Sequence, residues 1–276
     1  MSAPPPLTDR AALLAHRKRA AKNPALFLHE WVADEVNERL QEVNRTFTDI
    51  AIVTPWPQVW ISRFPDARII ADDDVLNLEQ ARFDLVIHAL TLHWANDLVG
   101  QLVQCRRALR PDGLFIGTLF GGETLTELRT ALAQAEVAVT GGLSPRIAPM
   151  AEIRDLGGLL QRAGFALPVA DSVTVPVEYE SPLHLMRDLR AMGETNALSD
   201  RLRSFTRREL VNKLQDFYVH TMCMDCARYL ATFDVVNLTG WAPAESQPKP
   251  LRPGSAKARL ADALGVPEHD PNTSKS

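Results

Sequence analysis

The chain has 276 residues, of which 46% are hydrophobic and 23% charged, so it can bury the core of one large globular domain. Its formal net charge of −4 argues against general affinity for nucleic acid. No apolar run reaches the roughly 20 residues of a membrane-spanning helix, and MSAPPPLTDR lacks the apolar segment of a secretory signal. Three cysteines are too few for a disulfide framework, which favours a reducing compartment.

The first half of the chain alternates between strand and helix patterns. In chain order these predict a helix at 25–40, a strand at 50–53, a brief helix at 58–64, a strand ending at the aspartates 72–74, a strand at 83–90, a helix at 98–109 stopped by a turn at RPDG, a strand at 114–120 and a helix at 123–139. The strands are continuously apolar, which indicates burial on both faces. This order predicts a parallel sheet with right-handed crossovers.

The second half predicts a loop at 141–149 and then further elements. These are a helix at 150–164, a strand at 168–179, a helix from Ser181 to about 198, a long helix at 206–231 and a last strand at 234–242. Pro176 cannot donate to a central ladder, so the strand that contains it should lie at an edge. Ser181 and Pro182 are typical of a helix start. The tail 245–276 is rich in proline, serine and charge and is expected to be mobile, apart from a short helix at 256–264.

Two motifs invite functional interpretations that the residues do not favour. The basic run HRKRAAK (16–22) is more typical of a solvated helix face than of a nucleic-acid site. CMDC (223–226) has the spacing of a metal-binding pair, but no second cysteine pair or nearby histidine pair completes four ligands. We therefore expect no metal, and two half-buried thiols in the predicted late helix.

Residues 83–129 contain an FDLV strand, an aromatic-containing loop, a helix, the turn RPDG and an apolar strand, in that order. This series resembles the class I S-adenosylmethionine-dependent methyltransferases. LHWANDL, GGLSPRIAP, DLGGLLQRAGF and MGETNAL narrow the resemblance to one branch. That branch contains the methyltransferase-like assembly factor of respiratory complex I, with bacterial relatives near the malonyl-carrier-protein methyltransferase of biotin synthesis. The resemblance covers roughly residues 16–256 and is weakest in its opening third.

DIAIVTPWPQVW (49–60) departs from the family pattern. The family carries Asp-Leu-Gly-Cys-Gly-x-Gly after its first strand, because only glycine lets the backbone pack against the cofactor. Here Pro55 and Pro57 remove N–H donors, and Trp56 adds bulk. The family also has a further strand–helix unit, which supplies the acid for the ribose, and residues 64–71 leave no room for it. We therefore expect a mostly parallel Rossmann-like sheet, one strand short of the family's seven, and weak or absent binding of S-adenosylmethionine.

The resemblance assigns five residues to the cofactor side. Asp72 corresponds to the adenine-side acid and Asp73 is its neighbour, while His88, Ala89 and Leu90 correspond to the strand end against the methionine part. The residues alone also permit a plainer interpretation. An acidic cluster at a strand end is often a solvated turn, and a histidine on an apolar strand is more often a hydrogen-bonded core residue.

A second set is expected to form the working surface, with a protein as its ligand. Its members follow two adjacent strands or lie in the loop after the next helix, where open α/β sheets place their ligands. They are His93, Trp94, Asn96, Gly121, Gly122, Thr124 and Arg146. Because Trp56 would fill the depth beside them, a shallow patch is expected. The structural alternatives are that Trp94 anchors the next helix and that Arg146 is an ordinary surface arginine.

The expected organisation is an N-terminal extension (1–24), a methyltransferase-like domain (25–244) with a helical cap from 121–150 and 181–231, and the tail. The resemblance implies a methyltransferase acting on a protein such as a complex I subunit, in the bacterial cytoplasm or, in a eukaryote, the mitochondrial matrix. Some members of the branch are associated with arginine hydroxylation instead. The alternative is a catalytically silent protein that chaperones its partner without a cofactor. The sequence leaves both open.

Overall fold

The computed structural model describes residues 5–219, 222–223 and 228–248. The chain divides into two compact units, Met1–Ala244 and Glu245–Ser276, and the first contains every helix and strand of the described residues. The short helix expected at 256–264 lies outside the described residues. Across the described part of the chain, no helix is long and apolar enough to cross a membrane.

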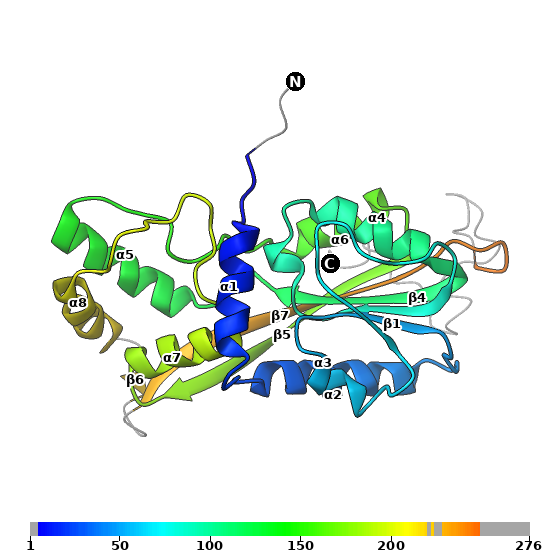
Figure 1. Ribbon diagram of the computed structural model, residues 1–276, viewed down its shortest axis with the longest axis horizontal. Helices are drawn as coiled ribbons and strands as arrows, with labels where there is room; N and C mark the ends of the chain where they lie inside the picture. The colour runs from blue at the N-terminus through cyan, green and yellow to red at the C-terminus, as the bar shows by residue number, and fades with distance from the viewer. Residues whose placement is uncertain (1–4, 220–221, 224–227, 249–276) are drawn as a thin grey trace, which may run out of the picture. The chain divides into compact units, whose positions relative to one another are not determined.

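A twisted sheet runs through the first unit (Figure 1). Its continuous path has the order β2-β1-β3-β4-β7-β5. The strands are β1 (Ile50–Val53), β2 (Arg68–Ile70), β3 (Phe83–His88), β4 (Leu109–Phe120), β5 (Ala166–Tyr179) and β7 (Arg228–Trp241). A seventh strand, β6 (Met222–Cys223), has two residues and pairs with β7 away from that path. The predicted α/β class and the edge position of the strand that contains Pro176 are confirmed.

The sheet is parallel in one half and antiparallel in the other. β1 pairs in parallel with β2 and β3, and β3 with β4, whereas β7 runs antiparallel to both β4 and β5. The expectation of a mostly parallel sheet therefore holds for half of the path. The order β2-β1-β3-β4 is that of a doubly wound fold without a strand outside β2, in agreement with the expected loss of one unit. Its topological switch point lies between β1 and β3.

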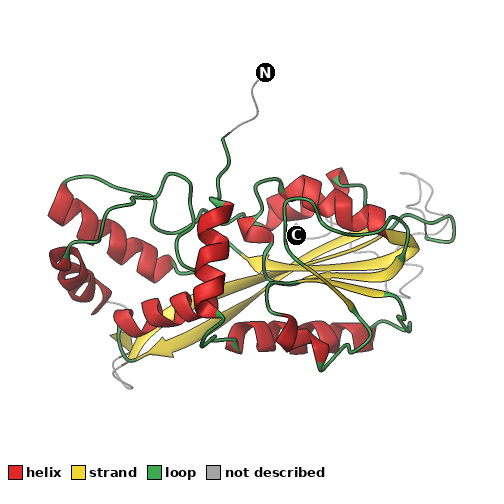
Figure 2. Ribbon diagram, in the orientation of Figure 1, coloured by secondary structure: helices red, strands yellow, loops and turns green. Residues whose placement is uncertain are grey.

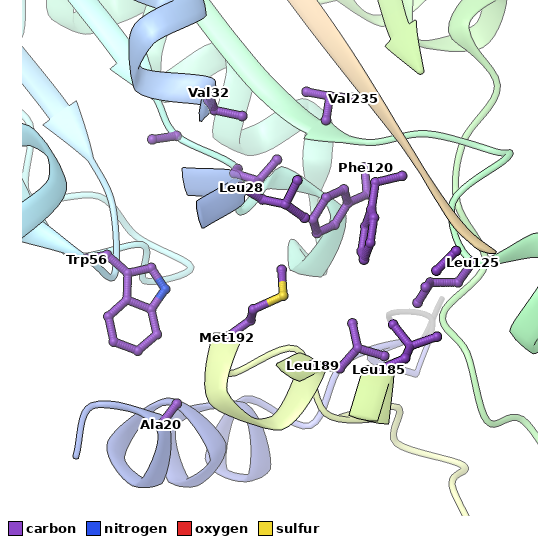
Figure 3. Packing of buried hydrophobic residues seen from close by; sticks show 14 of the residues in the cluster. Ala20, Leu28, Val32, Trp56, Phe120, Leu125, Leu185, Leu189, Met192 and Val235 are labelled. Atoms are coloured by element: carbon purple, nitrogen blue, oxygen red, sulfur yellow. The ribbon is translucent and has the colours of Figure 1, made fainter. Parts of the chain in front are cut away.

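Helices cover both faces of the sheet (Figure 2). In chain order they are α1 (Arg10–Ala20), α2 (Phe27–Glu42), α3 (Pro57–Ile61), α4 (Leu98–Ala108), α5 (Thr126–Thr140), α6 (Ile153–Arg162), α7 (Pro182–Met192) and α8 (Arg208–Tyr218). One core cluster packs α4 and α6 against the sheet. Another packs α2 and α3 on the opposite face and continues under α5, α7 and α8. In this cluster Leu185, Leu189 and Met192 point from α7 toward Phe120 at the end of β4 (Figure 3).

The two ends of α7 show why this helix lies where it does. The Ser181 side chain accepts a hydrogen bond from the His184 N–H, and Pro182 occupies the first turn, as predicted. Gly193 ends the helix with φ +82°. A Cβ at Gly193 would lie 2.9 Å from Cγ of Arg17 and 3.4 Å from the Trp56 ring. Glycine therefore lets the end of α7 pack closely against α1 and the loop after β1.

Several of the predicted element bounds are wrong, including that of the helix from Ser181, which ends at Met192 and not at about 198. The helix predicted at 206–231 ends at Tyr218, and strand β7 begins at Arg228. The β-branched and aromatic residues of β7 pair with β5. The Tyr218 hydroxyl donates to the carbonyl of Leu230 in β7 at 2.9 Å, which fixes the end of α8 against β7. Cys223 consequently lies in β6 and not in a helix, while Cys226 lies outside the described residues. β4 also begins earlier than predicted, because it includes RPDG.

Candidate functional site

The loop after β1 reaches the switch point of the sheet, where a doubly wound fold binds its ligand. The Thr54 N–H donates to the Ile70 carbonyl, and the Trp56 N–H donates to the Thr54 hydroxyl. The Trp56 side chain turns inward, is 3% exposed, and meets His29 of α2 edge to face with ring centroids 6.2 Å apart. An indole thus occupies the space that glycines would leave open.

Helix α1 contributes a buried cation to the same place. Arg17 donates to a carboxylate oxygen of Asp72 at 2.6 Å, and the two side chains are only 7% and 8% exposed. Arg10 lies 3.6 Å from Asp72 on the same helix face, and the Asp72 carbonyl accepts a further bond from it. The interpretation of 16–22 as a solvated face is therefore wrong for Arg17. Helical spacing puts Arg10, Leu13 and Arg17 on one face, and that face is turned to the sheet.

His88, at the end of β3, is held in a closed hydrogen-bond chain. The Gln101 amide nitrogen donates to the carbonyl of Asp73, so its oxygen faces His88 Nε2 at 3.2 Å and must accept. Nδ1 is then the acceptor for the Thr91 hydroxyl at 3.1 Å. Burial lowers the pKa of His88 to about 4, so the ring is neutral near pH 7. This arrangement matches the plainer interpretation, a core histidine.

The remaining cofactor-side residues leave little room. Ala89 and Leu90 are fully buried, and Asp73 is mostly exposed, 3.7 Å from Arg10. Leu90 has φ +51°, an unfavourable conformation for leucine, and its N–H donates to the Thr118 hydroxyl at 2.8 Å. The space left between α1, Asp72 and His88 is about 10 Å³, enough for one water molecule.

S-adenosylmethionine does not fit this crevice. Ligand pockets of drug size measure about 300–1,000 Å³, which the 10 Å³ beside Asp72 and His88 cannot provide. The candidate acid is already paired with Arg17, and the prolines of the loop donate nothing. Within residues 5–219, 222–223 and 228–248, no three His, Cys, Asp or Glu side chains gather as a metal site.

Glu194, the residue after Gly193, holds the aromatic pair of LHWANDL. Its carboxylate accepts from Trp94 Nε1 at 2.6 Å and from His93 Nε2 at 3.0 Å. The Phe120 N–H points to His93 Nδ1, which fixes that nitrogen as the acceptor. Burial by itself would raise the pKa of Glu194, but His93, Arg17 and the Trp94 donor together lower it below its ordinary value. The cluster is a buried, ionised carboxylate with matched donors.

Three other predicted residues have structural contacts of their own. Asn96 exchanges two hydrogen bonds with the backbone of Thr8, which fixes the segment before α1. A Cβ at Gly121 would lie 2.3 Å from Asp234, so this glycine is needed for close approach to β7. A Cβ at Gly122 would lie 2.7 Å from the Glu152 carboxylate.

Thr124 and Arg146 are likewise tied into the fold. Thr124 bonds to the backbone of Asp234 in both directions. Arg146 donates to Glu136 at 2.7 Å. Burial would raise the pKa of Glu136, but Arg146 and Ser144 lower it, so the loop 141–149 closes over a buried carboxylate. The simple surface interpretation of Arg146 is incomplete.

A cavity of about 550 Å³ lies beside the end of β4 and beside Phe233 of β7. It is lined by Trp94, Phe120, Thr124, Leu125, Leu132, Arg146, Ile147, Ala148, Met150, Met186, Leu189, Arg190, Glu194, Thr195, Asn196, Arg201, Leu202, Arg203, Thr206 and Phe233. Trp94, Thr124 and Arg146 of the predicted surface therefore meet there, whereas none of the five cofactor-side residues lines it. The expected shallow patch is wrong, because the space has a volume of about 550 Å³ and Trp56 is not among the residues that line it.

Sequence reasoning missed the groups that hold both places together. Arg17 was obscured by its basic neighbours, although its spacing from Arg10 and Leu13 was a usable signal. Glu194 lay within the recognised motif MGETNAL but had no assigned role. Arg190, Arg201 and Arg203 carry no local signal, since they come together at the cavity only through the packing of α7 and the loop 193–206.

Residues 35–117 match the family described as a methyltransferase domain. A protein of Rickettsia prowazekii (strain Madrid E) that carries a methyltransferase name is 32% identical over 167 residues, which cover 60% of this chain and 74% of that protein. The chain therefore belongs to the class I methyltransferase family.

Within the family, the chain is a homologue of arginine-hydroxylase NDUFAF5, mitochondrial. The protein of that name from Danio rerio is 40% identical over 201 residues, covering 73% of this chain and 62% of that protein. The Dictyostelium discoideum counterpart is 38% identical, and the match covers 45% of its length. The malonyl-acyl-carrier-protein O-methyltransferase of Methylovorus sp. (strain MP688) is 31% identical over 208 residues, covering 75% of this chain and 64% of that protein. The chain thus spans less than two thirds of these relatives.

A solved methyltransferase structure from Bacillus halodurans C-125 aligns with a TM-score of 0.47 and 11% identity, covering 75% of this chain and 98% of that chain.

Proposed function

We propose that this methyltransferase-family protein binds and chaperones a protein partner at the 550 Å³ cavity, and that it binds S-adenosylmethionine weakly or not at all. The observation that carries the proposal is the contrast between the two neighbouring places: about 10 Å³ beside Asp72 and His88, and about 550 Å³ beside β4 and β7. The crevice where the family holds its cofactor is filled by the chain's own side chains, whereas the cavity beside β4 and β7 is open.

The loss of cofactor contacts gives a weak expected affinity. Each missing backbone or ribose hydrogen bond costs about 0.5–1.5 kcal/mol, and each 1.4 kcal/mol is about tenfold in affinity. Losing three or four such bonds weakens a micromolar ligand to about millimolar. Displacing Arg17 from Asp72 would add the cost of a buried unpaired charge.

The proposed partner is a subunit of respiratory complex I or its assembly intermediate, and it comes from the resemblance to the assembly-factor branch. The relatives from Danio rerio and Dictyostelium discoideum carry the names arginine-hydroxylase and mitochondrial. By analogy we propose the mitochondrial matrix in a eukaryote and the cytoplasm in a bacterium. Methylation or hydroxylation of the partner would need a reactive group that the filled crevice does not favour, so chaperoning is the better-supported role.

The cavity rim supports a macromolecular partner. Leu202, which lines the cavity, is 56% exposed, and Phe205 on the same loop is 102% exposed. Exposed aromatic and aliphatic side chains beside arginines are typical of protein interfaces. These two positions are also good probes, because their side chains are largely outside the core and their replacement should leave the fold intact.

The test is co-purification of the tagged full chain with quinone-module subunits of complex I. The variant Leu202→Ser with Phe205→Ser should lose partner recovery while its melting temperature stays close to that of the wild type. The matched control is Val75→Ser with Val169→Ser, two apolar residues that are 80% and 55% exposed and do not line the cavity. Equal recovery with all three proteins would refute the proposed partner site.

A further inference from the structure

We propose that the 550 Å³ cavity receives an acidic segment of the protein partner, in which a carboxylate is flanked by apolar side chains. This inference rests on the proposed function, that the cavity is the partner site, and specifies the chemistry of the segment bound there. It rests on the composition of the floor, the charges around the mouth and the exposed side chains at the rim.

The floor of the cavity is apolar. Phe120 comes from the end of β4 and Phe233 from within β7, while Met186 and Leu189 come from α7. The flexible methionine side chain adapts to partners of different shape. This floor suits aliphatic or aromatic side chains of a bound segment.

The charged groups of the lining are mainly cationic. Four arginines line the cavity, Arg146, Arg190, Arg201 and Arg203, against the single carboxylate Glu194. Arg146 and Arg201 already pair with carboxylates, those of Glu136 and Asp9.

Two of the four guanidinium groups remain available to a ligand. Arg190 is exposed and has no ion pair among the described residues. The Arg203 side chain is 74% exposed and lies 3.8 Å from Asp9, at the limit of an ion pair. A guanidinium binds a carboxylate through two parallel N–H donors, which favours an acidic ligand.

A cationic side chain finds no equivalent partner in the cavity. The carboxylate of Glu194 is occupied by the Trp94 and His93 donors. An entering arginine would also meet the guanidinium groups of the lining, and like charges repel. The lining therefore selects against an arginine, the residue class that the names of the relatives would suggest as a substrate.

The rim favours a peptide segment over a small free acid. Phe205 is fully exposed on the loop between Arg203 and Thr206, both of which line the cavity. Leu202 is also half exposed. A small acid inside the cavity would leave Phe205 in water, whereas a polypeptide that continues past the mouth would cover it.

The experiment compares three capped, fluorescein-labelled pentapeptides that differ only in a central glutamate, glutamine or arginine between leucines. Binding to the wild-type chain is measured by anisotropy at about 50 mM salt, where exposed charges are least screened. The glutamate peptide should bind about tenfold more tightly than the glutamine peptide, and the arginine peptide most weakly. Equal affinity for the three peptides, tighter binding of the arginine peptide, or no binding of any peptide up to about 1 mM would overturn the inference.

Matched variants place the binding at the cavity. Arg190→Gln with Arg203→Gln should weaken the glutamate peptide by about tenfold and abolish its preference over glutamine. Arg187→Gln with Arg207→Gln removes the same charge from exposed arginines of neighbouring elements that do not line the cavity. The control should change the affinity less than about twofold at about 0.3 M salt, where long-range effects are screened. An equal loss in both variants would show general electrostatic attraction and overturn the site.

The outcome is separable from that of the proposed function. Micromolar binding of S-adenosylmethionine would refute the filled crevice and leave the acidic preference standing. The opposite result is also possible to distinguish: the Leu202→Ser, Phe205→Ser variant loses its partner, but the wild-type chain shows no preference for the glutamate peptide. That result would keep the partner site and refute its acidic specificity.

Discussion

The crevice between β1 and β3 and the cavity beside β4 and β7 lie at the same end of one sheet but differ in what fills them. In the crevice, Trp56 and the Arg17–Asp72 pair are buried, and about 10 Å³ is left beside Asp72 and His88. In the cavity, about 550 Å³ is open above an apolar floor. The difference lies in the side chains, because the chain's own residues pack the crevice as part of the core and leave the neighbouring cavity open.

The link between the two places is the end of α7. Gly193 lies against Arg17 and Trp56, and the next residue, Glu194, lines the cavity and holds His93 and Trp94. The packing of Gly193 against the filled crevice therefore also positions Glu194, which forms part of the cavity wall. If this comparison is right, substitutions in the crevice should act on stability, and substitutions at the cavity rim should act on binding.

The largest expected effect is at Arg17. Arg17→Met leaves the buried Asp72 carboxylate without its closest cation and should lower the free energy of unfolding by about 3–5 kcal/mol. Urea denaturation followed by circular dichroism measures this. Adding Asp72→Asn should recover part of the loss, since the unpaired charge is removed. Arg19→Met, an exposed neighbour on α1, is the control. A loss below about 1 kcal/mol for Arg17→Met would mean that the crevice is open to water.

The next effect is a pH dependence of the crevice histidines. Burial lowers the pKa values of His29 and His88 to about 4 from an ordinary 6.5. The unfolded chain therefore takes up protons between pH 6.5 and 4 that the folded chain refuses, and stability falls as the pH falls through this window. Each histidine contributes about 2 kcal/mol of this loss between pH 6.5 and 5.

The variant His29→Leu removes one of these two contributions. Both ring nitrogens of His29 are buried and have no hydrogen-bond partner among the described residues, so we expect an apolar side chain to be tolerated there. The slope of the unfolding free energy against pH, from denaturation at several pH values, should fall by about half in the variant. His184→Leu, at a partly exposed position on α7, is the comparison. An unchanged slope for His29→Leu would show that its ring is reached by solvent.

A smaller effect is expected at Thr118. Its hydroxyl accepts from the N–H of Leu90, whose φ of +51° must be held by its surroundings. Thr118→Val keeps the shape but leaves that N–H unpaired, so it should cost about 1–3 kcal/mol of stability. Thr130→Val, on the exposed face of α5, should cost less, because solvent can replace its lost bond. Equal losses would remove the special role of Thr118.

The smallest effect on stability is expected at the cavity rim. Phe205→Ser should change the melting temperature by no more than corresponds to about 0.5 kcal/mol, because its side chain is fully exposed. Differential scanning calorimetry measures this. A clear destabilisation would mean that Phe205 packs against the fold and that its exposure is not that of an interface residue.

The sequence predicted the parts of the molecule that depend on local pattern. Continuous apolar runs gave the central strands, and Ser181 with Pro182 marked the start of α7. The pattern could not separate helix from strand after Tyr218, where pairing with β5 decides the structure. It identified Trp56 as an obstruction, but not Arg17 as the partner of Asp72, because that contact joins positions 55 residues apart. The cavity was missed for the same reason, since its lining comes from Trp94, β4, α5, α7, β7 and the loops that join these later elements.

The central claim, that the chain's own side chains close the cofactor crevice, is tested most directly by calorimetric titration of the folded wild-type chain with S-adenosylmethionine and S-adenosylhomocysteine. We expect no saturable heat for either compound below about 1 mM, because neither can enter without displacing Trp56 and the Arg17–Asp72 pair. One-to-one binding with a micromolar dissociation constant for either compound would contradict the account.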